Sequence, residues 1–547
     1  MKLSTEVSSE KLRGGFYTPS ALVNVCLDRI ATLNNGRGKL TILEPSVGDG
    51  AFLRRLVKHE LNTSVKSFIG IELIEEEVQK CQEAARSAPF DTSISHMSTL
   101  EWAANTEKMV DAVIGNPPFV RYQFVPRLNL QNVERLGKRI GVAFRGVSNL
   151  WIPILLGALS RLKVGGSMAF VVPAEIFTGL SAGDVRSWLI EHFGHLQIDM
   201  FAPGSFPGVL QEVVVISGRR VDSTGNAGEV GREVLFVDYS SSGNTRSWSH
   251  MVPKTTQGWT RYLLTPTHLG ALQEARSLPY VQAFGNVAKL EVSIVTGANE
   301  YFSLTSDQVK QFQLYEWAEP LLPRIRYAEG LVYSREDQQA TASNGARAWL
   351  LNFGEQCPDP IENRGAAAYI ELGEAQGLHQ RYKTRIRYPW YRVPSVWTGR
   401  LMLSKRSHWF PRLVLNDANA LTTDTIYRGN LLPLYSGQEG DLVGAFHNSL
   451  TLLTAEIEGR SFGGGVLELV PSEIARLSIP FPVNTSDNLL RLDGISRASL
   501  RGQSNAAQLI DATDDLLSQR VDGLTKHLMS QLHQARETLA NRRLSRN

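Results

Sequence analysis

Cysteines, long apolar runs and a net excess of charge are all scarce in this sequence of 547 residues. The three cysteines, Cys26, Cys81 and Cys357, lie far apart and form no CxxC pair, which argues against a disulfide framework or a cysteine zinc site. No apolar run approaches the roughly 18 residues of a membrane helix, and the N-terminal residues lack the apolar core of a signal peptide. These absences predict a soluble protein of a reducing, cytoplasmic compartment, with no membrane contact and no metal site.

Charge of either sign is almost balanced, since 57 Lys and Arg residues stand against 54 Asp and Glu residues, a net charge of +3. Taken alone, this balance gives no sign of a strongly basic nucleic-acid binder, although an average can hide local segregation of charge. Hydrophobic residues make up 42% of the chain and charged residues 20%, values typical of a folded protein. At about 100–200 residues per domain, the length predicts two or three domains.

Alternating strands and helices are indicated over the first 220 residues. Because such alternation is typical of a mostly parallel sheet with helices on both faces, it predicts an α/β domain. In these sheets, ligands bind at the carboxyl ends of the strands. The expected strands are short apolar runs that end in acids, glycines or prolines, at residues 40–43, 67–71, 110–114, 167–172 and 213–216.

The first motif with chemical potential, LEPSVGDGAF, begins at Leu43, where an expected strand turns into a helix. Gly48 and Gly50 allow a tight turn and a close approach of backbone to ligand. Glu44 ends one strand, and Glu72 ends the next, where a carboxylate suits the two hydroxyls of a ribose. The spacing is not GxGxxG, so a nucleoside without a pyrophosphate fits better than a dinucleotide, and a plain tight turn is the alternative.

A second motif, GNPPF, follows the expected strand at 110–114. Pro117 and Pro118 fix the backbone and lack N–H donors, so the carbonyls of Asn116 and Pro117 are free to accept. The amide oxygen of Asn116 and the ring of Phe119 complete a surface suited to a planar base with an exocyclic amine. The alternative is a Pro-Pro turn with a core phenylalanine.

These motifs together resemble those of the gamma-class adenine-N6 DNA methyltransferases, which depend on S-adenosylmethionine and come mostly from bacterial restriction–modification systems. The resemblance rests on FYTP (residues 16–19), LEPSVGDGAFL, GIEL and GNPPF, which occur in the order found in that class. It implies a Rossmann-like catalytic domain, a mixed α+β target-recognition domain and C-terminal helices. We expect these parts at residues 1–245, 246–490 and 491–547.

Carried over to this sequence, the resemblance implies specific roles for residues of the first half. Asn116 and Pro117, with Pro118 behind them, would hold the amine of a flipped adenine between Phe119 and Phe206. The family usually has an Asp that meets the adenine of the cofactor, but this sequence has Ser98 at the matching position, which is a weaker acceptor. The residues expected around S-adenosylmethionine are Tyr17, Thr18, Pro19, Glu44, Ser46, Gly48, Gly50, Glu72 and Ser98.

The second half contains a basic segment, since residues 375–416 include nine Lys and Arg residues and no Asp or Glu. Aromatic residues are interleaved with these cations, which favours a footprint on the DNA backbone over a solvated face with core aromatics. Several stretches here also resemble the recognition region of the family. The residues expected to bind DNA are Arg381, Lys383, Arg385, Arg387, Arg392, Lys405 and Arg406.

Other functions stay open at this point. Cytosine-N4 methylation needs similar chemistry, a glutamine methyltransferase shares the NPP motif, and a DNA-binding modification subunit would need a partner. Only 13 residues precede Gly14 and no Lys follows an acid at the [DE]-x-K spacing of metal nucleases, so we expect modification without cleavage. The expected partners are double-stranded DNA and, as the resemblance allows, a separate cognate restriction endonuclease.

Overall fold

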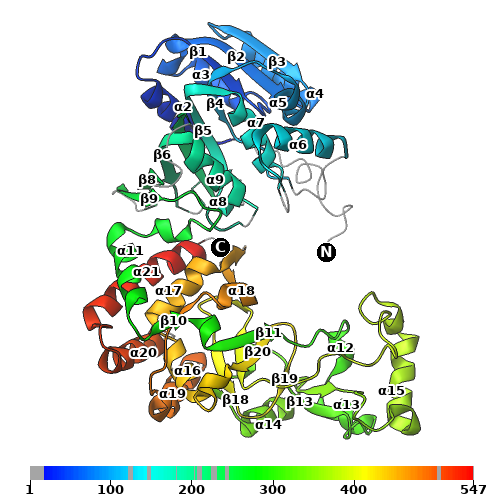
Figure 1. Ribbon diagram of the computed structural model, residues 1–547. Helices are drawn as coiled ribbons and strands as arrows, with labels where there is room; N and C mark the ends of the chain where they lie inside the picture. Colours follow the sequence, from blue (N-terminus) through cyan, green and yellow to red (C-terminus); the bar gives the residue numbers. More distant parts are fainter. Residues whose placement is uncertain are drawn as a thin grey trace. The chain divides into compact units, whose positions relative to one another are not determined.

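Two compact units make up the protein, one ending at Pro266 and the other beginning at Thr267 (Figure 1). The boundary expected at residue 245 falls between two strands that pair antiparallel, β8 (Arg232–Asp238) and β9 (Arg246–Val252). Because β9 is an edge strand that begins with two exposed polar residues, Arg246 and Ser247, its sequence resembles a linker. The computed structural model describes residues 18–120, 127–144, 149–179, 181–202, 204–205, 212–222, 231–240, 245–462, 464–501 and 507–545.

A nine-stranded sheet forms the centre of the first unit, in the order β3-β2-β1-β4-β5-β7-β6-β8-β9. The strands from β3 to β5 pair in parallel, and β7 runs antiparallel to both β5 and β6. This is the doubly wound arrangement, and it confirms the α/β prediction. The remaining strands are β1 (Leu40–Glu44), β2 (Val65–Glu72), β3 (Asp91–His96), β4 (Val110–Gly115), β5 (Leu162–Pro173), β6 (Phe193–Met200) and β7 (Val213–Arg220).

Both faces of this sheet are buried. Ile42 and Ile114 belong to a core that includes apolar side chains of the first helix, while their neighbours Leu43 and Val113, which point to the other face, are also fully buried. That first helix packs against β4, β5 and β7. The helices of this unit are α2 (Ser20–Asn34), α3 (Ala51–Val57), α4 (Glu75–Ala85), α5 (Thr99–Asn105), α6 (Arg127–Ile140), α7 (Trp151–Ser160), α8 (Glu175–Thr178) and α9 (Gly183–His192).

Small sheets build the second unit, in the strand orders β11-β20-β16-β18-β14, β12-β15-β13-β19, β17-β22-β21 and β10-β23. Many of these strands have only two or three residues, so they depend on pairing with distant segments. The strands are β10 (Val281–Ala283), β11 (Ala288–Val292), β12 (Ser303–Leu304), β13 (Ala318–Leu322), β14 (Val332–Tyr333), β15 (Trp349–Leu351), β16 (Leu401–Ser404), β17 (Arg406–Ser407), β18 (Leu413–Asn416), β19 (Leu421–Thr422), β20 (Ile426–Leu431), β21 (Arg460–Phe462), β22 (Val466–Glu468) and β23 (Ser478–Pro480).

Helices cover the second unit, and the C-terminal ones belong to it: α19 packs against α16 and α20, and α21 packs against α17. Among the described helices, none is both long and apolar enough to cross a membrane. The helices are α11 (Pro266–Ser277), α12 (Asn299–Phe302), α13 (Ser306–Gln311), α14 (Arg335–Ser343), α15 (Arg364–Ala375), α16 (Glu439–Phe446), α17 (Ser449–Glu458), α18 (Pro471–Ile474), α19 (Leu489–Leu500), α20 (Ala507–Arg520) and α21 (Lys526–Leu544).

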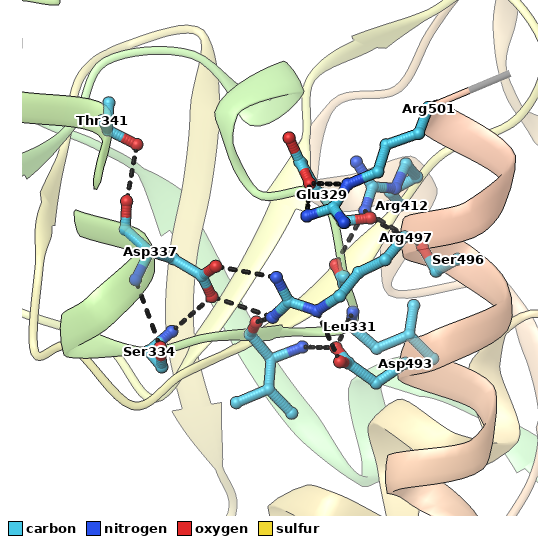
Figure 2. A network of polar contacts seen from close by, with 12 residues as sticks. Glu329, Leu331, Ser334, Asp337, Thr341, Arg412, Asp493, Ser496, Arg497 and Arg501 are labelled. Atoms are coloured by element: carbon cyan, nitrogen blue, oxygen red, sulfur yellow. Dashed lines mark hydrogen bonds and ion pairs between the residues drawn. The ribbon is translucent and has the colours of Figure 1, made fainter. Parts of the chain in front are cut away.

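A polar network joins α19 to the strand and helix that follow Gly330 (Figure 2). Arg497 donates to both carboxylate oxygens of Asp337, at 2.7 and 2.9 Å, and to Asp493 at 2.7 Å. Asp493 in turn accepts from the backbone N–H groups of Leu331 and Val332, at 2.7 and 2.9 Å. The network therefore fixes α19 to β14 and α14 by charged hydrogen bonds.

Candidate active site at the carboxyl edge of the first sheet

The turn between β1 and α3 needs glycine at two positions. Gly50 has φ of 85°, and a Cβ there would lie 3.3 Å from the Cα of Cys81, so a side chain would push α3 away from α4. Gly48 has φ of 50°, and a Cβ there would meet no atom of the protein within 4 Å. The turn thus packs closely on one side and is open at Gly48, as a backbone surface for a ligand should be.

Glu72 ends β2 directly beside this turn. Its Oε2 accepts from the N–H of Gly48 at 3.0 Å, and its Oε1 accepts from the N–H groups of Leu73 at 2.8 Å and Ile74 at 3.0 Å. These three bonds fix the carboxylate while leaving acceptor capacity on Oε2, because a carboxylate oxygen can accept two hydrogen bonds. The structure therefore brings the expected ribose-binding acid and the glycine turn together.

Ser98 stands at the entrance to α5, one residue after the N–H of Met97 bonds the carbonyl of Glu72 at 2.9 Å. Ser98 is buried, and its neighbour Thr99 donates its hydroxyl hydrogen to the carbonyl of Pro45. This bond ties α5 to the turn after β1. Ser98 therefore lies near the end of β2 that carries Glu72, where the family's acid is expected to meet the cofactor.

Glu44, the last residue of β1, is a buried acid with an unsatisfied oxygen. The residue is 2% exposed, and its Oε2 has no hydrogen-bond partner among the residues that the structure describes. Burial, reinforced by the negative charges of Asp49 and Glu72, raises the pKa of the Glu44 carboxyl well above its usual value, against the opposing effect of Arg54. A cationic ligand would offset this desolvation, so the site fits the ammonium group of S-adenosylmethionine.

Asn116 stands at the end of β4, next to the strand that carries Glu44. Its Nδ2 donates to the Thr18 hydroxyl at 3.1 Å, and its buried Oδ1 has no hydrogen-bond partner among the described residues. A Cβ at Gly115 would lie 3.3 Å from the Pro45 ring, so glycine lets the two strand ends lie close together. The bond to Thr18 orients the amide so that its oxygen remains available as an acceptor.

The other residues expected around this site have different positions. Pro117 is buried, Pro118 and Phe119 are half-buried, and the Phe119 ring packs on the core between α2 and the sheet. Pro19 caps the N-terminal end of α2, and the Ser46 hydroxyl donates to the Pro45 carbonyl at 2.8 Å. Tyr17 and Phe206 lie outside the described residues. In the described part of the chain, no group of three His, Cys, Asp or Glu residues could hold a metal ion.

The basic segment of the second unit divides into exposed cations and cations that hold the fold. Arg381, Lys383 and Arg385 are exposed and form no ion pair with the described residues. Arg387, by contrast, donates to the backbone carbonyls of Val295 and Thr296 at 2.7 and 2.8 Å. Three exposed charges are therefore gathered on one short loop.

Acids from outside the basic segment neutralise part of its charge. Arg392 lies 3.4 Å from Glu355, and Arg406 forms an ion pair with Glu468. Lys405 is half-buried. These pairings could not be read from the segment alone, because both acids come from other parts of the chain.

Sequence reasoning missed two features of these sites. The bond between Thr18 and Asn116 joins positions that it had assigned to the cofactor and to the base. The exposure of Ile386 also went unnoticed, since an apolar residue between cations normally indicates a packed side chain. The FYTP motif, which contains Thr18, was the signal for the bond between Thr18 and Asn116. The sequence contains no signal for the exposure of Ile386.

Comparisons with known proteins agree with this geometry. Residues 3–247 match the family of N-6 DNA methylases, and residues 256–517 match the C-terminal domain of the type II methyltransferase M.Eco57I. The type II methyltransferase M.AccI of Acinetobacter calcoaceticus is 20% identical over 541 residues, which cover 94% of this chain and 95% of M.AccI. The type II methyltransferase M.HincII of Haemophilus influenzae is 26% identical over 215 residues, 38% of each chain.

A solved structure has a similar fold. The type IIL restriction–modification enzyme MmeI in complex with DNA aligns over 98% of this chain and 78% of its own, with a TM-score of 0.51 and 14% identity. The doubly wound sheet and the site at its carboxyl edge thus define an S-adenosylmethionine-dependent methyltransferase. More particularly, residues 3–247 belong to the N-6 DNA methylase family, and the chain resembles a type II methyltransferase over 94% of its length.

Proposed function

We propose that this protein methylates N6 of an adenine that is flipped out of duplex DNA, with Asn116 and its neighbours as the base-binding residues. The observation that carries the proposal is the pair of unsatisfied buried oxygens, Glu44 Oε2 and Asn116 Oδ1, at adjacent strand ends. The Glu44 oxygen suits the ammonium group of the cofactor, and the Asn116 oxygen suits the amine of the base. Most buried acceptors in a folded protein are paired, so two unpaired oxygens at the edge where such sheets bind ligands support a ligand site.

The reaction needs little beyond positioning. An adenine amine is a weak nucleophile because its lone pair is delocalised into the ring. When Asn116 Oδ1 and the Pro117 carbonyl accept both amine hydrogens, a pyramidal nitrogen is favoured and its lone pair is held in line with the methyl group. S-adenosylmethionine, when bound, supplies that methyl group on a positively charged sulfur. The proton can leave after the attack, so no general base has to act first.

The remaining roles concern binding. Glu44 would face the ammonium group of the cofactor, Glu72 its ribose hydroxyls, and Ser98 its adenine amine. Phe119 would stack on the flipped base, which helps to offset the few kcal/mol of unstacking. Ser98 is a weaker acceptor than a carboxylate, so cofactor binding relies more on the two glutamates.

Nucleoside analysis tests the function. Protein, labelled S-adenosylmethionine and duplex DNA are incubated, and the DNA is digested to nucleosides. We expect labelled N6-methyladenosine with the wild type and at least about a hundredfold slower transfer with Asn116→Ala, the scale of losing one key hydrogen bond in a reacting complex. Asn344→Ala, at an exposed amide after α14, is the control and should be unchanged.

Other products would point to the alternatives. N4-methylcytosine would support cytosine modification, and no methylated nucleoside would leave a DNA-binding subunit that needs a partner. Unchanged transfer by Asn116→Ala would remove the proposed role of that residue.

A cytoplasmic location and a partner nuclease also belong to this proposal. Type II methyltransferases such as M.AccI resemble the chain over its length, and modification protects DNA when a separate endonuclease cuts the same sequence. We expect cells that express this protein to yield plasmid DNA resistant to one such endonuclease.

A further inference from the structure

One loop of the second unit, residues 381–388, carries large apolar side chains into solvent. Tyr388 is 99% exposed, Ile386 71% and Tyr382 69%. The aromatic residues that come next, Trp390 and Tyr391, are instead buried in a core of the second unit. Exposed apolar side chains gathered in one place mark an interaction site more often than those scattered singly.

The 381–388 loop is held firmly by its other residues. Thr384 is fully buried, and its hydroxyl lies within hydrogen-bond reach of the carbonyls of Leu378 and, at 3.1 Å, Arg381. Arg387 donates to the carbonyls of Val295 and Thr296. The backbone is therefore fixed at two points between which Ile386 projects, and binding would cost little ordering of the loop.

Positive charges alternate with the exposed apolar residues. Arg381, Lys383 and Arg385 are exposed and form no ion pair with the described residues, and residues 375–416 contain no acid. The Arg385 guanidinium carbon lies 5.5 Å from the centre of the Tyr382 ring. A partner must therefore offer negative charges beside apolar faces, and duplex DNA offers phosphates beside stacked bases.

We propose that the 381–388 loop is a wedge that inserts Ile386 and Tyr388 between bases of the DNA duplex, while its three exposed cations bind phosphates. This inference rests on the proposed function, because that function makes DNA the substrate. Apolar wedges of this kind partly unstack a base step and kink the duplex. The wedge would thus bend the DNA that the second unit binds.

The variant Ile386→Ser/Tyr388→Ala tests the wedge in the full-length protein. Both side chains are exposed, so the fold should be kept. On a dye-labelled duplex that the wild type methylates, we expect about tenfold weaker binding or more, an unchanged salt dependence and loss of the bend seen by energy transfer between the duplex ends. Lys383→Gln/Arg385→Gln should keep the bend but lower the salt slope by about one for each cation.

Leu434→Ser, at a leucine that is 80% exposed elsewhere in the second unit, is the matched control and should leave both binding and bend unchanged. If the double variant binds and bends DNA like the wild type while both methylate it, the wedge is wrong and the proposed function stands. If the wild type neither binds nor methylates DNA, the wedge and the proposed function are both wrong. Loss of binding to phosphatidylserine vesicles, with DNA binding unchanged, would assign the loop to a membrane instead.

Discussion

Glu44 and Asn116 show how a single unsatisfied atom can mark a site. Each has one buried oxygen without a partner in the described structure, and each stands at a strand end beside the open glycine turn. A buried acceptor left unpaired costs free energy unless a ligand meets it. Both residues should therefore matter more when ligand is bound than when it is absent.

Glu44→Gln separates these two states. Since burial raises the pKa of Glu44, the folded protein binds a proton that the unfolded chain releases, so stability falls as the pH rises above the usual glutamate value of about 4.3. A glutamine side chain does not titrate, so it makes no contribution to the pH dependence of stability. Without cofactor, we expect the stability of the variant relative to wild type to increase from pH 5 to pH 8, as measured by thermal unfolding.

Although Glu44→Gln should favour the stability of the cofactor-free protein at pH 8, it should weaken cofactor binding. Loss of a charge-assisted contact to the ammonium group should weaken S-adenosylmethionine binding by about tenfold or more in calorimetric titration. Glu83→Gln, at an exposed acid on α4, is the control for both measurements. A stability difference that does not vary with pH would contradict the desolvation of Glu44.

At the scale of elements, α2 connects β6 with the loop that follows β4. Its N-terminal end follows Thr18, which bonds Asn116, and its middle carries Arg29, which donates to both oxygens of the fully buried Asp199 on β6, at 2.8 and 2.9 Å. Tyr239 lies 2.8 Å from the same guanidinium. Helix α2 is therefore tied to β6 by Arg29 and is preceded by the residue that bonds the Asn116 amide.

Arg29→Met should break this link. Among the described residues, it leaves the buried Asp199 carboxylate with the neutral amide of Gln197 as its side-chain hydrogen-bond partner, at 2.7 Å, so we expect the protein to lose about 3 kcal/mol of stability. Arg29→Met/Asp199→Leu removes both charges and should recover most of that loss. Urea unfolding of the wild type, the single variant and the double variant measures these free energies. If the double variant is no more stable than Arg29→Met, the loss comes from altered packing and not from an unpaired buried carboxylate.

The elements that sequence reasoning could predict are those with strong local signals. The apolar runs of β1, β2, β4, β5 and β7 were expected, and since parallel strands end at one edge, so was the gathering of Glu44, Glu72 and Asn116. In contrast, β3 has the polar sequence DTSISH with three exposed positions, and it is a strand because it pairs with β2. The short strands of the second unit likewise form through distant partners, which no local pattern records.

At the scale of the whole molecule, the C-terminal helices are part of the second unit. The sequence predicts a separate segment from residue 491, yet α19 joins β14 and α14 through Arg497, Asp337 and Asp493 (Figure 2). A Cβ at Gly330 would overlap the Asp493 carboxylate, so glycine lets the helix approach closely at this point. Helical periodicity is visible in a sequence, but the partner of a charged residue is not.

Arg497→Met tests whether this network stabilises the unit. Burial alone would raise the pKa of Asp337. Hydrogen bonding and attraction to Arg497 nevertheless hold this pKa below its usual value. The stabilisation is therefore fully present above about pH 4 and is lost as the pH falls towards the lowered value. At pH 7 we expect the variant to lose about 3 kcal/mol in urea unfolding, because two partly buried carboxylates lose their partner.

The loss should shrink when the same unfolding is measured below about pH 4, since a protonated Asp337 no longer needs Arg497. Arg501→Met, which breaks a more exposed pair with Glu329, should cost less than about 1 kcal/mol and serves as the control. If α19 folds with the rest of the second unit, Arg497→Met should shift the whole tryptophan-fluorescence transition of that unit. A transition that splits in two, with the main part unmoved, would instead mean that the C-terminal helices unfold on their own.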